Sequence, residues 1–296
     1  MTSECSNTSS RASPAPPRVV SEYSPPSTVN PLSAEPVALW AAALTASAIA
    51  AVAWQLKSLT APGAVVATLV GVAVLSGTGW GGGIVLGTYF ITSIAASRAF
   101  PWGKQSPTFE DSRRTAWQVA ANGGAAAVGG LIGMAHAGLG WWIVTAALAG
   151  AAADTWATEV GKATGGTPRD LLTGKPVPPG TSGGVTTAGT VAGAGGAAVI
   201  GLVAGAVTGW PTLAVAGVVI GFSSMMADSV LGAAWQVRYA CPACRAECEE
   251  SRHRCGAVAE YQRGIPWLNN DAVNMAATTI AAGAGGLWWW LARAAS

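Results

Sequence analysis

Long apolar runs separated by short polar segments dominate this 296-residue sequence. A run of about 20 apolar residues can cross a bilayer as a helix, which satisfies its own backbone groups in lipid. The pattern therefore predicts an all-α bundle of about eight transmembrane helices, between seven and nine. The second run is short, so it fits a tilted helix, a re-entrant segment, or a tight hairpin through Gly77-Thr78-Gly79. The predicted spans are residues 37–56, 63–79, 80–98, 116–137, 139–158, 186–207, 211–233 and 272–292.

The first 36 residues differ from the rest of the chain. They are rich in Ser, Thr and Pro and lack apolar periodicity, so we expect residues 1–36 to be a disordered tail. These residues lack the basic stretch and following apolar core of a signal peptide, so we do not expect one. Glu4, Glu22 and Glu35 weaken a transit-peptide interpretation. The predicted integral membrane domain therefore covers residues 37–296.

Composition supports a membrane protein. Hydrophobic residues make up 51% of the chain and charged residues only 10%, whereas a soluble domain carries about 25% charged residues. The basic residues lack the interleaved aromatics of a nucleic-acid surface, so we expect no nucleic-acid partner. Small residues at GxxxG spacing predict close helix packing. These pairs are Gly189/Gly193, Gly201/Gly205, Gly205/Gly209 and Gly217/Gly221.

The distribution of Lys and Arg predicts the orientation. With eight spans, thirteen of the sixteen basic residues fall on one side, leaving Arg11, Arg18 and Arg293 on the other. The positive-inside rule places the basic side in the cytoplasm, or in the stroma of an organelle, and both termini outside. We expect Trp141-Trp142, Trp210 and Trp288-Trp289-Trp290 to form an aromatic belt at the outer face. The basic side holds Lys57, Arg98, Lys104, Arg113, Arg114, Lys162, Arg169, Lys175, Arg238, Arg245, Arg252, Arg254 and Arg263.

Two acids interrupt the apolar runs and are the strongest functional signal. Asp154 lies late in the fifth predicted span and Asp228 late in the seventh, and acids inside membrane helices are costly and usually functional. Spans that run the other way carry polar residues near their starts, so all should lie at one depth near the basic face. The alternative is ordinary hydrogen bonding between helix ends. These polar residues are Gln118, Asn122, Thr181, Ser182, Asn269, Asn270, Asp271 and Asn274.

Two carboxylates with nearby amides and basic residues fit a Mg²⁺-nucleotide site, because Mg²⁺ prefers hard oxygen ligands and bridges to phosphate. Asp154 and Asp228 are the natural metal ligands. The Gly-rich, basic loop over residues 165–184 ends at a predicted helix start, where free N–H groups attract phosphate; it could equally be an ordinary flexible loop. Arg113 and Arg114 either reach phosphate or anchor the helix at the membrane surface.

Further polar side chains flank the two acids. Glu159 lies off the helical face of Asp154 and either supports the site or is a solvated loop residue. Asp228, Gly232 and Gln236 share one face, and Gly232 would leave room beside the acid. We expect four residues to contact the metal ligands without binding the metal themselves: Thr158, Glu159, Ser229 and Gln236.

Four of the five cysteines crowd into the predicted cytoplasmic loop at residues 238–264. Cys241 and Cys244 form a CxxC pair, and His253 and Cys255 follow downstream. A Cys₃His set would satisfy a tetrahedral, structural Zn²⁺, although Cys248 leaves the ligand set ambiguous. The alternatives are free thiols, or a disulfide if the topology is inverted.

The order and spacing of these motifs resemble one integral membrane family, the one that includes plant phytyl-phosphate kinase and animal transmembrane protein 19. The resemblance covers roughly residues 37–296. A more distant similarity is to CTP-using dolichol and phytol kinases and CDP-diacylglycerol synthase. The motifs are Arg113-Arg114-Thr115 to Asn122-Gly123-Gly124, Ala153-Asp154-Thr155-Trp156-Ala157-Thr158-Glu159, Gly180-Thr181-Ser182-Gly183-Gly184, Asp228-Ser229-Val230-Leu231-Gly232 with Gln236, the Cys/His residues, and Asn269-Asn270-Asp271 with Asn274.

The resemblance implies a kinase that converts an isoprenoid monophosphate, such as phytyl phosphate, to its diphosphate in prenyl-lipid or tocopherol metabolism. Its expected donor is CTP or another nucleoside triphosphate with Mg²⁺. By this resemblance Asp154 and Asp228 hold Mg²⁺, while Lys175 and the Thr181–Gly184 turn hold nucleotide phosphates; Lys175, however, precedes Pro176 where the synthase has a Lys-Lys-Thr run. The alternatives are another CTP-dependent lipid-phosphate transferase, a transporter of a phosphorylated or lipid substrate, and a non-catalytic scaffold.

Overall fold

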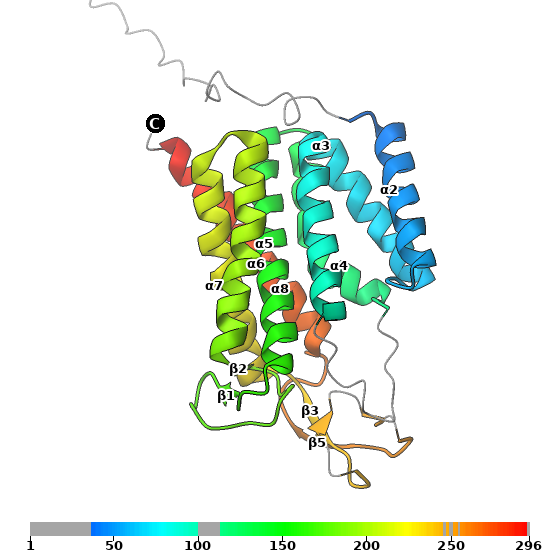
Figure 1. Cartoon of the computed structure of the whole chain (residues 1–296), viewed down its shortest axis with the longest axis vertical. Coiled ribbons are helices and arrows are strands. Elements are labelled where there is room, and N and C mark those ends of the chain that lie inside the picture. The colour runs from blue at the N-terminus through cyan, green and yellow to red at the C-terminus, as the bar shows by residue number, and fades with distance from the viewer. Residues whose placement is uncertain (1–36, 100–112, 245–246, 249–250, 254, 295–296) are drawn as a thin grey trace, which may run out of the picture.

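The computed structural model describes residues 37–99, 113–244, 247–248, 251–253 and 255–294. Expectations for residues 1–36, Lys104, Arg245 and Arg254 fall outside these ranges. The described chain is a helical bundle with short strands at one end (Figure 1). Its helices are α2 (Leu39–Gln55), α3 (Ala61–Ala99), α4 (Ala116–Gly133), α5 (Ala137–Ala163), α6 (Thr187–Thr208), α7 (Pro211–Trp235) and α8 (Asn270–Ala294). Its strands are β1 (Arg169–Asp170), β2 (Gly184–Val185), β3 (Arg238–Ala240), β4 (Glu247–Cys248) and β5 (Glu260–Arg263).

The described residues thus contain seven helices, and the expected eight separate helices are not supported. The difference arises in α3, which joins the second and third predicted spans. Its backbone leaves helical geometry at Gly79, where φ is 68°. A Cβ on Gly83 would lie 2.6 Å from Leu75 Cδ2, although residues eight apart in a straight helix are about 12 Å apart. The chain therefore folds back on itself at Gly79, as the hairpin alternative predicted.

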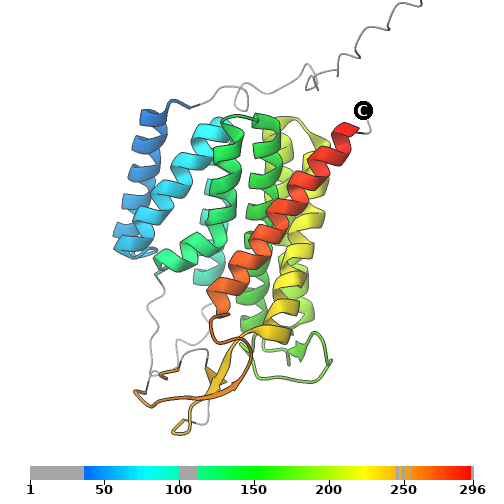
Figure 2. The same cartoon turned by 180° about the vertical axis from the view of Figure 1, so that it is seen from behind.

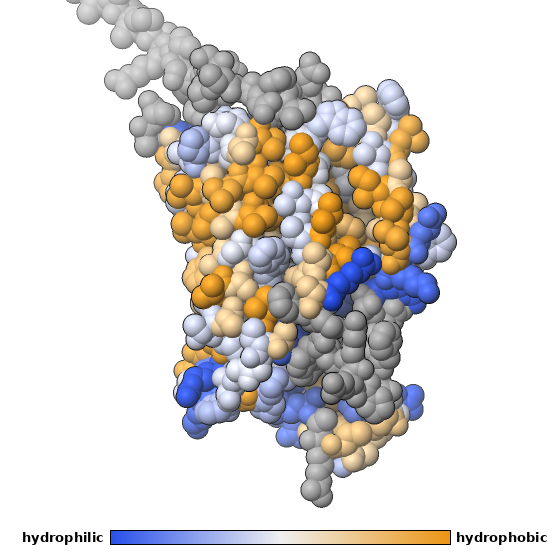
Figure 3. Space-filling view, in the orientation of Figure 1, coloured by the Kyte–Doolittle hydropathy of each residue, from blue (hydrophilic) through white to orange (hydrophobic). Residues whose placement is uncertain are grey.

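Four of the described helices, α3, α5, α6 and α7, are long and apolar enough to cross a membrane. The remaining helices are shorter or more polar: α2 has 17 residues and α4 has 18, while α8 begins with Asn270 and Asp271. Apolar side chains cover much of the bundle surface, and hydrophilic ones gather toward the end that carries the strands (Figure 3). The structure therefore agrees with an integral, multi-pass membrane protein.

Helix α5 forms the centre of the bundle. It packs against α3, α4, α6, α7 and α8, and every residue from Gly140 to Ala153 is buried. The expectation that Trp141 and Trp142 belong to an aromatic belt is therefore wrong. Trp141 is only 1% exposed, and Trp142 stacks on Trp288 of α8 with ring centroids 6.5 Å apart. Their position is explained by the central place of α5, which leaves no lipid-facing side in this stretch.

Glycines permit the closest helix contacts, as their spacing predicted, except that Gly209 lies just beyond the end of α6. A Cβ on Gly193 of α6 would lie 3.0 Å from the Ala153 carbonyl oxygen of α5. A Cβ on Gly201 would lie 2.6 Å from the Ala214 carbonyl oxygen of α7, and one on Gly221 would lie 2.7 Å from Ala149 Cβ. Backbones this close exclude larger side chains. Figure 2 shows α8 crossing the back of the bundle obliquely, where it contacts α4, α5 and α7.

The strands and connecting loops lie at one end of the bundle, and the Ala294 end of α8 lies at the other, as does the start of α2 (Figure 1). Strand β1 pairs antiparallel with β2, and β3 lies between β4 and β5. These segments carry basic residues, including Arg169, Lys175 and Arg238. The bundle therefore has one end rich in loops and basic side chains, while its orientation in a membrane stays a prediction.

Candidate functional site

Four helices bring the two acids and two asparagines to one narrow internal pocket. Asp154 comes from α5, Asp228 from α7, Asn122 from α4 and Asn274 from α8. In this conformation the pocket is too narrow to admit a water molecule. Polar residues that are up to 152 positions apart therefore meet, as their positions in the predicted spans indicated. The remaining lining residues are Gly150, Ala151, Ser224, Ala277 and Thr278.

Hydrogen bonds between helices hold the walls of this pocket. Ser224 Oγ donates to the Ala277 carbonyl oxygen at 3.0 Å and joins α7 to α8. Thr278 Oγ1 donates to the Ala121 carbonyl oxygen at 2.8 Å and joins α8 to α4. Gly150 allows α5 to approach α7, because a Cβ there would lie 2.5 Å from Ser224 Oγ. Sequence reasoning missed these two hydroxyls, because a lone Ser or Thr in a helix usually bonds to its own backbone.

The Thr181–Gly184 turn does not line the pocket but packs on the end of α7. A Cβ on Gly232 would lie 2.3 Å from Ser182 Oγ, so Gly232 makes room for the turn rather than for Asp228 as expected. Ser182 Oγ donates to Gln236 Oε1 at 2.5 Å, and Arg238 Nη2 donates to the Ser182 carbonyl oxygen at 2.6 Å. Since Gly232 follows Asp228 by one helical turn, the glycine-rich turn lies about 6 Å further along α7.

The basic loop before this turn is a small β1–β2 hairpin with an internal carboxylate. Asp170 Oδ1 accepts hydrogen bonds from the N–H groups of Leu172 and Thr173 and from Thr173 Oγ1. The Thr173 N–H makes the largest contribution to lowering the pKa of Asp170 below its usual value of 3.8. Lys175 is exposed and is not among the residues that line the pocket.

The two arginines before α4 lie in a different contact region. Arg114 Nη1 donates to Tyr89 Oη at 3.1 Å, and its guanidinium lies 6.0 Å from the Tyr89 ring centroid. Its backbone bonds to Ser58 and Thr60 at the α2–α3 connection. Arg114 therefore anchors the start of α4 against α3, and neither it nor the half-buried Arg113 lines the pocket.

The expected supporting residues take separate positions. Glu159 lies inside α5, which continues to Ala163, and accepts a hydrogen bond from Ser97 Oγ at 2.8 Å. It is therefore neither a loop residue nor part of the pocket wall. Thr158 and Ser229 are half-buried on α5 and α7 outside the pocket lining, and Asn270 is exposed at the start of α8.

A second polar group lies in the loop after α7. The ligand atoms of Cys241, Cys244, His253 and Cys255 all lie within 4.8 Å of one another. Cys241 Sγ lies 3.6 Å from Cys255 Sγ, and His253 Nδ1 lies 3.1 Å from the same sulfur. The described cysteines are free thiols, so the disulfide alternative is not supported. Cys248 lies in β4 and is not part of the group.

Hydrogen bonds shift the pKa values of two thiols in this group in opposite directions. The hydrogen bond with His253 is the main cause that lowers the pKa of Cys255 to about 6. The pKa of Cys244 is raised to about 11, mainly through its hydrogen bond with Cys255. Metal ions bind thiolates, so the Cys255 sulfur is in the form that a metal requires near neutral pH.

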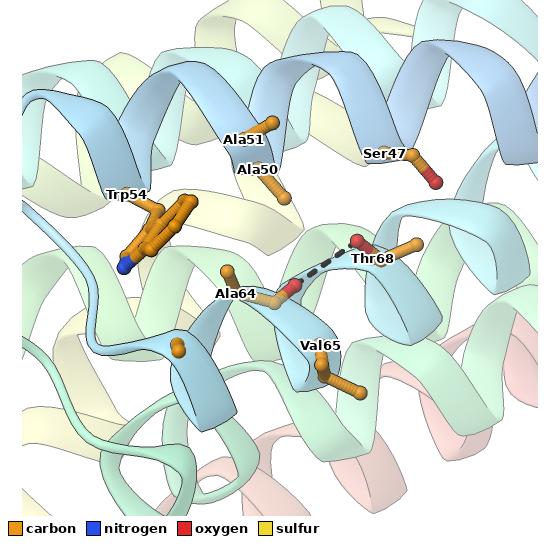
Figure 4. A pocket seen from close by; sticks show the side chains of 8 residues that line it. Ser47, Ala50, Ala51, Trp54, Ala64, Val65 and Thr68 are labelled. Atoms are coloured by element: carbon orange, nitrogen blue, oxygen red, sulfur yellow. Dashed lines mark hydrogen bonds between the residues drawn. The ribbon is translucent and has the colours of Figure 1, made fainter.

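A further pocket lies between α2 and the first half of α3 (Figure 4). It has a volume of about 210 Å³ and is lined by Trp54, Ala50, Val65 and other small or apolar side chains. The Thr68 hydroxyl donates to the Ala64 carbonyl oxygen in the same helix. The pocket lining contains no titratable group, so it offers no catalytic chemistry.

The fold and the polar pocket between the helices define a helical, multi-pass membrane protein in which Asp154 and Asp228 share one site. The chain belongs to the family described as Integral membrane protein DUF92, whose model matches residues 44–282. The match includes every residue that lines the polar pocket. Comparisons with curated proteins and with solved structures gave no match.

Proposed function

We propose that this protein is an integral membrane kinase that phosphorylates an isoprenoid monophosphate, phytyl or prenyl, to the diphosphate. CTP or another nucleoside triphosphate is the donor, and Mg²⁺ is the cofactor. The observation that carries the proposal is the meeting of Asp154 and Asp228 in one pocket with Asn122 and Asn274. Carboxylates inside membrane helices are energetically costly, and such residues are usually retained because they have a function.

The residues of the pocket suit a magnesium ion. Asp154 and Asp228 supply carboxylate oxygens, and Asn122 and Asn274 supply amide groups, which are the hard ligands and hydrogen-bonding partners that Mg²⁺ and its waters favour. Bound Mg²⁺ would neutralise charge on the transferring phosphoryl group. Because a substrate phosphate is already a nucleophile, the pocket needs no strong general base.

The proposed reaction transfers the γ-phosphoryl group of the donor to the isoprenoid phosphate. An oxygen of the isoprenoid phosphate forms a bond to the γ-phosphorus of the donor, and the bond to the bridging oxygen of the nucleoside diphosphate breaks. The nucleoside diphosphate leaves with the electron pair, and no oxidant or reductant takes part. The main tasks for the protein are positioning and charge neutralisation.

The surroundings of the pocket support this assignment. The Ser182–Gly184 turn packs one helical turn beyond Asp228, with Arg238 bonded to its backbone, which is a suitable place for nucleotide phosphates. Apolar side chains such as Val191, Leu202 and Val215 face outward from α6 and α7 and offer a surface for an isoprenoid chain. The lipid chain would stay in the membrane, and the pocket would open beyond the conformation of this structure to admit the phosphate.

A kinase assay on the full-length protein in detergent tests the proposal. Phytyl and geranylgeranyl monophosphates are supplied with each nucleoside triphosphate and Mg²⁺, and the diphosphate product is measured. We expect Asp154→Asn and Asp228→Asn to reduce turnover by about 100-fold or more, because each removes a charge from the metal site. Glu260→Gln, which changes an exposed carboxylate in β5, is the control and should retain activity.

The assay also separates the alternatives. Folded wild-type protein that forms no diphosphate with any donor would exclude the kinase for these substrates. A nucleotidyl-lipid product would instead indicate a CTP-dependent nucleotidyltransferase. Substrate-dependent uptake into proteoliposomes without a covalent product would indicate a transporter.

A further inference from the structure

We propose that Cys241, Cys244, His253 and Cys255 bind one structural Zn²⁺ that holds the loop after α7 in place. The four ligand atoms lie within 4.8 Å of one another. In a tetrahedral site with Zn–S bonds of about 2.3 Å, neighbouring sulfurs are about 3.8 Å apart. The 3.6 Å separation of the Cys241 and Cys255 sulfurs matches this geometry.

The ligand types select the metal. Three thiolates and one imidazole favour Zn²⁺ over Mg²⁺ or Ca²⁺, which prefer oxygen ligands. The Cys244 N–H lies 3.5 Å from Cys241 Sγ, so the backbone of the CxxC pair already folds around the first sulfur. All four protein positions are filled, which describes a closed structural site rather than a catalytic one.

The described residues of this loop form only short strands and a small apolar core. Strands β3, β4 and β5 contain only two to four residues each, and all of β5 is exposed. Buried apolar residues are few here: Val237 and Ala259 are buried, whereas Val258 and Tyr261 are exposed. Small elements without a core need a disulfide or a metal for stability. Since the described cysteines are free thiols, a metal is the stabiliser that fits.

The zinc group is connected to the end of α7 and to the turn that packs on it. Cys241 directly follows β3, whose Arg238 bonds to the Ser182 carbonyl oxygen. At the other side of the sheet, Arg263 Nη1 donates to the Ala233 carbonyl oxygen at 2.9 Å. A metal that binds Cys241 at the end of β3 therefore also restrains Arg238 and, through it, the turn that contains Ser182.

The first experiment is metal analysis of the full-length protein, purified in detergent with reductant and without chelator. We expect about one zinc per chain in the wild type and in Cys248→Ser, because Cys248 lies outside the group. Cys244→Ser and Cys255→Ser should each lose most of the zinc. Cobalt substitution should give thiolate charge-transfer and tetrahedral d–d absorption in the wild type and in Cys248→Ser only.

A second measurement keeps the test valid if the ligand variants fail to fold. Wild-type protein is compared with and without a strong chelator, and hydrogen exchange is followed in residues 181–184 and 238–240. Faster exchange in both segments after chelation, with the helices still protected, supports the proposal. Wild-type protein that contains no zinc, Cys248→Ser that loses zinc as fully as Cys244→Ser, or unchanged exchange at residues 181–184 would overturn it. These readouts need no kinase activity, so failure of the proposed function would not affect them.

Discussion

Replacing Gly183 with alanine should detach the glycine-rich turn from α7. Gly183 has a φ of +76°, and a Cβ there would lie 2.5 Å from both the N and Cβ atoms of Ala233. The substitution therefore imposes two separate costs: a left-handed backbone conformation for a residue with a Cβ, and a collision with a helix backbone that cannot move far.

The structure allows the size of each cost to be worked out. The left-handed conformation costs about 1–2 kcal/mol, and overpacking of this kind costs about 1–3 kcal/mol. The turn can avoid the collision by lifting off α7, but it then loses the Ser182–Gln236 and Arg238–Ser182 hydrogen bonds. Those two bonds are worth about 2–4 kcal/mol together. Both routes lead to a loss of about 2–5 kcal/mol.

Gly174→Ala is the matched control. Gly174 has a φ of +68°, but a Cβ there would meet nothing within 4 Å. It should therefore cost only the backbone term of about 1–2 kcal/mol. Thermal unfolding in detergent should show a clearly larger drop in Tm for Gly183→Ala, and hydrogen exchange should rise at residues 181–184 in that variant alone. Equal drops in Tm, with residues 181–184 still protected, would refute the steric argument.

Two other predictions concern helix packing and the β1–β2 hairpin. Gly77→Ala should destabilise the bundle by about 2–4 kcal/mol in thermal unfolding, because its Cβ would overlap the Gly130 carbonyl oxygen. Gly87→Ala, inside α3 with open space at its Cβ, should leave the stability unchanged or raise it by up to about 1 kcal/mol, because alanine is the better helix former. Equal Tm values for the two variants would contradict this. The pKa of Asp170 is lowered in the folded protein, so its stabilisation is present above the usual value of 3.8 and lost as the pH falls through the folded-state pKa. Hydrogen exchange at residues 169–175, corrected for the intrinsic pH dependence, should therefore rise on acidification in the wild type and lose this pH dependence in Asp170→Asn; a wild-type hairpin equally protected at pH 3 and pH 6 would refute it.

The helices and the convergence of the acids could be predicted from the sequence for simple reasons. Apolar length determines where a helix can cross a membrane, and a charged residue inside such a run stands out. Asp154 and Asp228 were found in this way, and they share a pocket with Asn122 and Asn274. Their roles in catalysis stay predictions.

Other parts of the site depend on contacts that no local pattern encodes. Ser224 and Thr278 resemble ordinary helix hydroxyls in sequence, and only the crossing of α8 over α4 and α7 gives them partners on other helices. Arg114 follows the pattern of a phosphate-binding or anchoring arginine, and the sequence gives no sign of its contact with Tyr89 on α3. Gly232 faces a loop that the helical-face argument did not consider.

The connection between the second and third predicted spans could not be decided from the sequence for a related reason. Hydrophobic runs show where apolar segments lie, but they do not show whether the backbone interrupts its helix between them. At Gly79 a single residue with positive φ reverses the chain, so the second and third predicted spans form the two arms of α3 with no loop between them. The short polar segments around the β3–β5 sheet gave too few alternating residues to predict strands.

The chain order of the pocket has a consequence for biosynthesis. The arms of α3 contact each other across a one-residue reversal, so this hairpin can form as soon as residues 61–99 have been synthesised. The pocket instead draws on α4, α5, α7 and α8, and its last wall, at Asn274 and Thr278, is translated after the other three. A nascent or truncated protein that ends before α8 would therefore enter the membrane with Asp154 and Asp228 lacking their final covering helix. Completion of the acid site is thus tied to the translation of α8.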